Sequence, residues 1–332
     1  MNKVLIIGGA GYIGTVLTDY LLSLKYSVRS LDNFIYKNNS TIIPFIGRKG
    51  YEFMHGDLCD IGILDKALHN VDHVIILAGL VGDPITKKYP KESKLINELG
   101  IQNCIKFLNG KGLKKVVFVS TCSNYGILKS GEIANETYDL KPLSLYAKAK
   151  VSCEKYILSL KGHTDYCPII LRFATAFGIS PRMRFDLTVN EFTRELAIGN
   201  ELVVFDELTW RPYCHIRDFA TLIELVLIAE DKNVRFQVYN AGADVNNYTK
   251  KGLVDQILRK VPSGKVNYKK EGSDPRNYRV NFSKVKNAFG FIPRYTVKDG
   301  INELLEALNN QIFIEEDNSA IRLGNYTISY KI

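Results

Sequence analysis

Two residues four positions apart, Tyr146 and Lys150, are the pair in this chain best suited to proton transfer. A helical pattern opens at Tyr146, and side chains four apart lie on one face of a helix. A nearby ammonium stabilises a phenolate and lowers the pKa of the tyrosine toward neutrality. Such a tyrosine can take the proton of a hydroxyl group while the carbon that bears it is oxidised.

Hydroxyl groups stand shortly before this pair, at the end of an expected strand over 115–120. The strand runs into Ser120, Thr121, Cys122 and Ser123. A hydroxyl at the strand end can hydrogen-bond the same oxygen that the tyrosine deprotonates. A Tyr-x-x-x-Lys spacing is common by chance, so this interpretation depends on a cofactor site elsewhere in the chain.

Three evenly spaced glycines indicate that cofactor site. Gly8, Gly11 and Gly14 follow a buried apolar run over 4–7 and open an apolar helical pattern. In a dinucleotide-binding unit the first glycine permits a tight turn, the second lets the backbone approach a pyrophosphate, and the third lets the helix pack closely. The helix N-terminus offers free N–H groups to the phosphates. A bound nicotinamide cation would further lower the pKa of Tyr146.

The second strand, expected over 27–31, indicates which dinucleotide binds. It ends in Asp32-Asn33, 18 residues beyond Gly14, where an acidic residue bonds the adenosine ribose 2′-hydroxyl. A carboxylate there repels a 2′-phosphate, so NAD is favoured over NADP. Lys37 lies near enough in sequence to leave NADP open, and the alternative role for Asp32 is that of a residue that starts a loop.

Alternating strand and helix patterns predict an α/β fold with a doubly wound parallel sheet and a smaller, mixed C-terminal lobe. We expect a dinucleotide-binding domain over 1–178, continued by 203–240, and a substrate-binding lobe mainly over 179–332, interleaved with the core. The tail over 318–332 could form a strand or hairpin. The strands are expected at 3–8, 27–31, 51–54, 73–77, 115–120 and 166–172, and the helices at 12–25, 60–69, 91–109 and 144–161.

Composition excludes several classes of protein. The 332 residues are 46% hydrophobic and 24% charged, as in a soluble globular protein, and no apolar stretch reaches the length of a membrane span. The six cysteines are scattered, which suits reduced thiols in the cytoplasm and predicts no metal site. The net charge of +9 is spread along the chain, which argues against nucleic-acid binding and suits an anionic small substrate.

Over roughly residues 1–310, these motifs together resemble an extended short-chain dehydrogenase/reductase of the nucleotide-sugar epimerase/dehydratase family. The resemblance implies that Thr121 is the catalytic hydroxyl, Tyr146 the base and Lys150 its partner. An alternative role for Asp57 is that of a helix N-cap. The implied cofactor contacts are Gly8, Gly11, Tyr12, Ile13, Gly14, Asp32, Asn33, Asp57, Leu58, Leu77, Ala78, Gly79, Asn97, Val119, Ser120, Tyr146 and Lys150.

The same resemblance implies a nucleotide-diphosphate sugar as substrate, with Arg211 and Arg276 at its phosphates. An arginine fork matches phosphate oxygens. Thr175 stands where the family usually has Asn, and Glu271 where it commonly has Arg, so the substrate contacts are expected to be altered. The implied substrate contacts are Val81, Gly82, Thr121, Cys122, Ser123, Thr175, Arg182, Asn190, Arg211 and Arg276.

Two local features narrow the reaction. Family members that remove water place Asp-Glu after the catalytic Thr, whereas this chain has Cys122-Ser123, neither of which is a carboxylic acid. Segments 80–84 and 177–186 resemble a subgroup that includes GDP-manno-heptose 4-dehydrogenases of bacterial capsule pathways. We therefore expect oxidation at C4 of GDP-heptose or a related hexose, with a small-molecule co-oxidant. The alternatives are a 4-epimerase and a non-catalytic NAD-binding scaffold or sensor.

Members of this family pair two helices across a subunit interface, which implies a homodimer or a homotetramer built from such dimers. The helices correspond to 91–109 and 144–161. Burial in the subunit's own core is the alternative for the apolar side chains concerned, which are Leu95, Leu99, Ile105, Leu108, Val151, Tyr156 and Ile157.

Overall fold

The computed structural model describes residues 2–272, 274–313 and 323–329. A seven-stranded parallel sheet runs through the larger part of the molecule, with strand order β10-β6-β5-β4-β1-β2-β3. The chain changes direction across this sheet between β1 and β4, which is where a doubly wound sheet opens a crevice. The strands are β1 (Lys3–Ile7), β2 (Ser27–Asp32), β3 (Tyr51–His55), β4 (His73–Ile76), β5 (Lys115–Thr121), β6 (Cys167–Phe173) and β10 (Gln237–Ala241).

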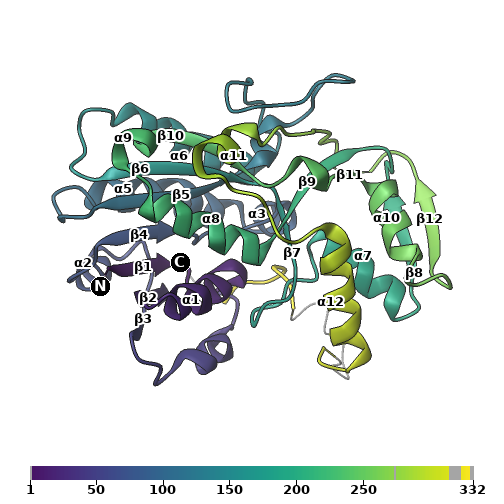
Figure 1. The fold of residues 1–332 in the computed structure, drawn as a ribbon, viewed down its shortest axis with the longest axis horizontal. Coiled ribbons are helices and arrows are strands. Elements are labelled where there is room, and N and C mark those ends of the chain that lie inside the picture. Colours follow the sequence, from purple (N-terminus) through teal and green to yellow (C-terminus); the bar gives the residue numbers. More distant parts are fainter. Residues whose placement is uncertain (1, 273, 314–322, 330–332) are drawn as a thin grey trace.

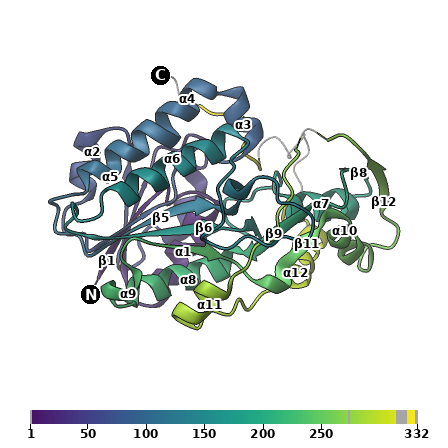
Figure 2. The same cartoon turned by 90° about the horizontal axis from the view of Figure 1, so that it is seen from above.

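Helices cover both faces of this sheet (Figure 2). On one face lie α2 (Ile61–Ala67), α3 (Asp83–Lys88), α4 (Pro90–Lys94), α5 (Ile101–Phe107) and α6 (Leu145–Ser159), with π-helical turns at Leu95–Gly100 joining α4 to α5. On the other lie α1 (Tyr12–Ser23), α8 (Ile216–Ile228), α9 (Asp231–Val234) and α11 (Ser283–Phe289). Because both faces are covered, β1, β4, β5 and β6 are almost wholly apolar and buried.

A smaller lobe of mixed structure flanks the carboxyl ends of the strands (Figure 1). Its three-stranded sheet contains β7 (Thr175–Phe177), β9 (Trp210–His215) and β11 (Asn247–Thr249), and its two-stranded sheet contains β8 (Glu201–Phe205) and β12 (Lys265–Lys269). Its helices are α7 (Thr188–Ala197), α10 (Lys250–Leu258) and α12 (Val297–Asn309). Short 3₁₀ helices occur at Asn39–Phe45, Cys122–Tyr125 and Asp244–Asn246.

The predicted fold class is confirmed, and the six expected strands and four expected helices are all present within two residues of their predicted ends. The segment 203–240, expected to continue the dinucleotide-binding domain, is divided between that domain and the smaller lobe. Its first part, β8 and β9, belongs to the lobe, whereas α8 packs on α1 and β10 is the edge strand of the large sheet. The tail expected from 318 onward lies partly outside the described residues, and its described part, 323–329, contains no strand.

The helices expected at a subunit interface bury much of their apolar surface inside the subunit. Ile105, Leu108 and Ile157 belong to a buried core cluster of the subunit and Val151 is also buried, whereas Leu99 is 45% exposed. Burial in the subunit's own core, the alternative role for these side chains, therefore accounts for Ile105, Leu108 and Ile157. Within the described part of the chain, no helix is both long and apolar enough to cross a membrane.

Candidate active site

The glycine-rich turn after β1 forms one wall of a large cavity. Gly8 has φ +92°, and a Cβ there would lie 2.7 Å from the Ala78 nitrogen, so only glycine fits. A Cβ on Gly14 would lie 2.3 Å from the Gly8 carbonyl oxygen. Gly11 is the N-cap of α1 and provides no side-chain cap, which leaves the first N–H groups of α1 to a ligand. The turn thus fits a pyrophosphate.

The loops after β2 and β3 form the next part of the wall. The Asp32 carboxylate accepts hydrogen bonds from the Ala10 and Phe34 nitrogens, at 3.0 and 2.9 Å, and burial raises its pKa. Asn33 donates to Asp57 at 2.8 Å, which ties the two loops together. Asp57 is not a helix N-cap, since Asp60 caps α2.

Asn97 holds the loop after β4 and does not line the cavity. Its amide accepts from the Leu80 nitrogen at 2.7 Å and donates to the Leu80 oxygen at 2.8 Å. Its side chain is completely buried within the π-helical turns. The expected cofactor contact is therefore indirect: Asn97 positions Leu80 and the adjacent Gly79, which does line the cavity.

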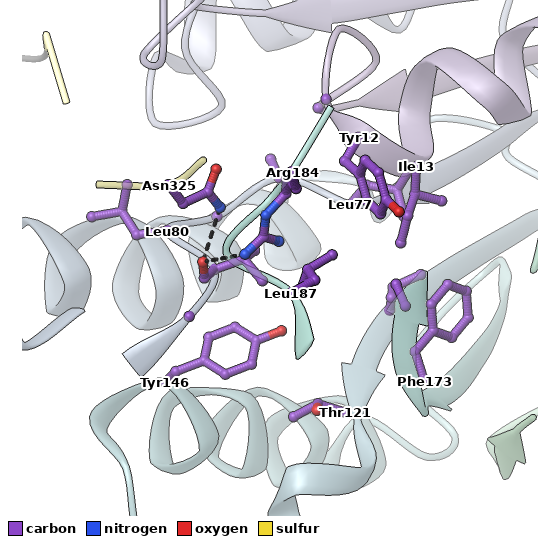
Figure 3. A pocket seen from close by; sticks show the side chains of 18 of the residues that line it. Tyr12, Ile13, Leu77, Leu80, Thr121, Tyr146, Phe173, Arg184, Leu187 and Asn325 are labelled. Atoms are coloured by element: carbon purple, nitrogen blue, oxygen red, sulfur yellow. Dashed lines mark hydrogen bonds between the residues drawn. The ribbon is translucent and has the colours of Figure 1, made fainter. Parts of the chain in front are cut away.

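Thr121, Tyr146 and Lys150 line the same cavity, where β5 ends beside the start of α6. Figure 3 shows the Tyr146 ring and the Thr121 side chain on one side of it. The Lys150 ammonium is buried, donates to the Val119 oxygen at 2.7 Å and lies 5.8 Å from the centre of the Tyr146 ring. Burial lowers the pKa of Lys150 to about 8.

The pKa of Tyr146 is raised above its ordinary value by the protein alone, whereas the lowering expected from the sequence requires a nicotinamide cation in addition to Lys150. Burial is the main cause, and among the neighbouring charges Arg184 opposes the rise whereas Asp83 adds to it. Burial therefore outweighs the neighbouring charges of the protein itself at this phenol. A further cation next to Tyr146 would be needed to lower its pKa, and a bound nicotinamide supplies one.

A buried ion pair supports the catalytic helix from behind. Glu154, one turn after Lys150, pairs with Arg172 of β6 at 2.7 Å. Ser120 donates its hydroxyl to the same carboxylate, and Asn124 donates to it at 2.8 Å. Ser120 therefore lines the cavity with its hydroxyl already engaged, and the network fixes α6 against the end of β5.

The opposite end of the cavity is built from charged side chains. Asp274 accepts from Arg211 at 3.0 Å and from Arg276 at 2.7 Å, and these cations hold the pKa of its partly exposed carboxyl well below its usual range. Arg276 also pairs with Asp83 at 2.9 Å. Lys250 lines this end as well, so several cations are available to a diphosphate.

A pair of arginines from the segment after β7 covers the middle of the cavity. Arg184 pairs with Asp186 at 2.5 Å and donates to the Val81 oxygen at 3.3 Å. Asn325 of the C-terminal segment donates to the same oxygen at 2.9 Å (Figure 3). Arg182 donates to backbone oxygens, and desolvation lowers its pKa to about 10.

Two expected substrate contacts, Cys122 and Asn190, do not line the cavity. The Cys122 thiol is buried against the Arg172 oxygen. The Asn190 amide accepts from the Gly178 nitrogen and donates to the Tyr12 hydroxyl and the Arg184 oxygen, so it joins the glycine-rich turn to the lobe. The expected residues that do line the cavity are Gly8, Gly11, Tyr12, Ile13, Gly14, Asp32, Asn33, Asp57, Leu58, Leu77, Ala78, Gly79, Val81, Gly82, Val119, Ser120, Thr121, Ser123, Tyr146, Lys150, Thr175, Arg182, Arg211 and Arg276.

The polar residues of the cavity that sequence reasoning missed include Asp83, Arg184, Lys250 and Asn325. Asp83 and Arg184 lie inside segments that resemble a known subgroup, which was a usable signal. Nothing in the local sequence marks Lys250 or Asn325. Among the described residues, no group of three His, Cys, Asp or Glu side chains is arranged to hold a metal ion.

The chain matches a known protein family and several known proteins over most of its length. The model of the "NAD dependent epimerase/dehydratase family" matches residues 4–242. The chain is 25% identical over 320 residues to a dTDP-glucose 4,6-dehydratase of Streptomyces niveus, covering 92% of both chains. It is 25% identical over 314 residues to a UDP-glucose 4-epimerase of Halalkalibacterium halodurans, covering 88% of this chain and 91% of that one.

Solved structures share the fold. A UDP-glucose 4-epimerase of Thermus thermophilus in complex with NAD superposes with a TM-score of 0.79 at 23% identity, covering 92% of this chain and 99% of that one. A UDP-glucuronic acid 4-epimerase of Bacillus cereus, in complex with UDP-glucuronic acid and NAD, superposes with a TM-score of 0.82 at 22% identity, covering 93% and 99%.

Proposed function

The chain belongs to the NAD dependent epimerase/dehydratase family, and from that premise we propose that it oxidises C4 of a nucleotide-diphosphate sugar with NAD, giving a 4-keto sugar. One observation supports this most strongly: Tyr146 and Thr121 border the same cavity as the glycine-rich turn and a cluster of cations. Such a cavity can hold a dinucleotide and an anionic sugar nucleotide together.

Each group has a role in this proposal. Arg211 and Arg276 bind the diphosphate and so orient the sugar. Tyr146, as phenolate, takes the proton of the C4 hydroxyl, and Thr121 donates a hydrogen bond to the same oxygen. Lys150 stabilises the phenolate. NAD, held by the turn at Gly8 and by the loops after β2 and β4, supplies the acceptor for the hydride that leaves C4.

The proposal also specifies the sugar and the nucleotide base of the substrate. Segments 80–84 and 177–186 resemble GDP-manno-heptose 4-dehydrogenases, so GDP-heptose or a related hexose is the proposed substrate. Release of the keto sugar then requires a co-oxidant to restore NAD. A 4-epimerase is the second candidate, because a UDP-glucose 4-epimerase is among the relatives. The intact set of Thr121, Tyr146 and Lys150 argues against a non-catalytic scaffold.

The test is to incubate NAD-loaded protein with GDP-, UDP- and dTDP-sugars and to follow the products by NMR and the NADH absorbance band. A dehydrogenase reduces about one equivalent of cofactor per site and then stalls until an acceptor is added. A 4-epimerase forms the epimer over many turnovers with no net absorbance change. Absence of oxidation or epimerisation of every nucleotide sugar offered would contradict the proposed function.

A homodimer formed through the helical segments 91–109 and 144–161 is also proposed, with Leu99 of the π-helical turns as its exposed apolar contact. Leu95 and Tyr156 are partly exposed on the same helical segments. A dimeric mass by light scattering that becomes monomeric on Leu99→Glu would support it, and a monomeric mass for the unchanged protein would contradict it.

A further inference from the structure

Arg182 is a buried guanidinium of the cavity that pairs with no carboxylate of the described residues. Among these residues four arginines line the cavity, and the other three form ion pairs with aspartates: Arg184, Arg211 and Arg276. Arg182 is only 6% exposed, yet within the described part of the chain no carboxylate lies within ion-pair distance of it. A buried charge without a counter-ion costs free energy, so an anionic ligand is expected beside Arg182.

Backbone oxygens hold the Arg182 side chain in place. Its Nη1 donates to the Met183 oxygen and its Nη2 to the Gly324 oxygen, both at 3.2 Å. A guanidinium has five N–H groups, so the other three have no partner among the described residues. Burial and the neighbouring Arg184 lower the pKa of Arg182 to about 10, which is the direction expected for a cation that lacks a close anion.

Arg182 lies beside the first turn of α1, where the glycine-rich turn presents its N–H groups. Ser180, two residues earlier, accepts from the Arg182 nitrogen at 3.2 Å and donates to the Tyr12 oxygen at 2.7 Å. The Tyr12 hydroxyl in turn donates to the Gly178 oxygen at 2.5 Å. The segment 178–182 is therefore fastened to the N-terminus of α1, the end of a helix that attracts a phosphate.

The Arg182 guanidinium also reaches the loop after β2. Its Cζ lies 5.0 Å from the centre of the Tyr36 ring, and the Asp32 carboxylate at the end of β2 stabilises its charge from beyond ion-pair distance. Asp32 is itself engaged by the Ala10 and Phe34 nitrogens. Arg182 thus lies between the two structures that hold a dinucleotide, the glycine-rich turn and the end of β2.

The chemistry of NAD offers one group to this cation. The adenine, the riboses and the carboxamide are neutral and the nicotinamide ring is positive, so the pyrophosphate is the anion that NAD carries. The planar fork of a guanidinium matches phosphate oxygens. The substrate's diphosphate is the competing anion, but its expected partners, Arg211 and Arg276, are held together through Asp274 at the opposite end of the cavity.

We propose that Arg182 binds the pyrophosphate of NAD from the side of the smaller lobe, facing the N–H groups of the glycine-rich turn. Arg182, implied by the resemblance to contact the substrate, is thereby a cofactor residue. The contact holds for any nucleotide sugar and for any reaction at C4, so it can fail while the proposed function stands.

The substitution Arg182→Met removes the charge and keeps an unbranched side chain that can pack on Tyr36. The NAD affinity of cofactor-free protein should fall roughly 10-fold or more, because charge-assisted hydrogen bonds to phosphate are lost. ADP-ribose carries the same pyrophosphate and should lose as much, whereas adenosine should bind both proteins alike. Arg48→Met is the matched control, because Arg48 also lies over an aromatic ring, that of Phe45, in an exposed pair with Asp19.

Calorimetry gives the affinities for NAD and ADP-ribose, and displacement of fluorescent NADH gives that for adenosine. UDP and GDP are then titrated into NAD-saturated protein, where they report on the substrate's diphosphate site, and Arg182→Met should leave their affinities unchanged. Thermal melting without ligand establishes that each variant is folded. Arg182→Lys keeps the charge without the fork, so its loss of NAD affinity should be smaller, and it carries the test if Arg182→Met does not fold.

Three results would overturn the inference. An NAD affinity that stays unchanged in every folded variant of Arg182 would show that the side chain makes no cofactor contact. A loss for adenosine equal to that for NAD would place Arg182 at the adenosine and not at the pyrophosphate. A fall in UDP or GDP affinity with NAD affinity intact would assign Arg182 to the substrate and leave the proposed function standing.

Discussion

The two ends of the cavity are built by different means. At the cofactor end the ligand-facing groups are mainly backbone atoms of tight turns, such as the turn at Gly8 and the start of α1. At the substrate end they are charged side chains that hold one another, as in the chain of contacts from Arg211 through Asp274 and Arg276 to Asp83. Tyr146 stands where the two ends meet.

This difference has a functional consequence. At a site made of backbone N–H groups, pyrophosphate binding depends on the conformation of the turn and little on the side chains. A site made of paired ions can be retuned by exchanging one side chain, as a change in Asp83 or Arg276 would alter both charge and hydrogen-bonding direction. Apart from the contact proposed for Arg182, we therefore expect cofactor binding to be sensitive to shape and substrate binding to be sensitive to charge.

The largest effect is expected at the junction of the two ends. Tyr146→Phe should bind NAD normally and lose at least ~100-fold in rate, because removal of a positioned acid–base group costs on that scale. Tyr156→Phe, on the same helix but outside the cavity, is the control. Steady-state rates with the best nucleotide sugar measure the effect, and turnover by Tyr146→Phe near that of the control would show that Tyr146 is not the base.

NAD affinity should fall when a single carbon is added to the glycine-rich turn. Gly8→Ala places a Cβ 2.7 Å from the Ala78 nitrogen at φ +92°, so the turn must open and NAD affinity should fall roughly 10-fold or more. Gly47→Ala is a matched control, since Gly47 has φ +81° with nothing within 4 Å of the added carbon. Titration of cofactor-free protein with NAD gives the affinities. Equal NAD affinities in the two variants would contradict the role of the Gly8 turn in cofactor binding.

The sequence predicted the cofactor end of the cavity better than the substrate end. The glycines and Asp32 lie in one short strand–turn–helix–strand segment, so their spacing alone indicated their positions. The direction of a side chain depends on long-range packing, which explains why Asn97, Cys122 and Asn190 proved to lie outside the cavity lining. Lys250 and Asn325 reach the cavity from elements far along the chain, and no local pattern marks them.

Substrate binding should weaken when the shape of a cation at this end changes and its charge does not. Arg211→Lys keeps one positive charge but loses the planar fork that binds Asp274 and, in the proposal, the diphosphate. KM for the nucleotide sugar should rise roughly 10-fold while NAD affinity stays unchanged. Arg48→Lys, in an exposed pair with Asp19, controls for the substitution itself. A fall in NAD affinity in Arg211→Lys would contradict the claim that this end of the cavity binds only the substrate.

A smaller effect is expected from pH. Burial lowers the pKa of Lys150 to about 8, so its ammonium is present below that pH and is lost above it. The cation beside Tyr146 then disappears, and the rate should decline a few-fold as pH rises through about 8. The pH–rate profile measures this. Lys150→Met should be slower below pH 8 and lack this decline, whereas an unchanged profile would assign the decline to another group.

Transfer of the hydrogen on C4 tests the central claim most directly. NAD-loaded protein is mixed with a nucleotide sugar that carries deuterium at C4, and the cofactor and sugar are analysed by mass spectrometry and NMR after one turnover. The account predicts deuterium in the reduced nicotinamide and a 4-keto sugar that has lost it. Reduced cofactor without deuterium, or a 6-deoxy-4-keto product formed by loss of water, would contradict it.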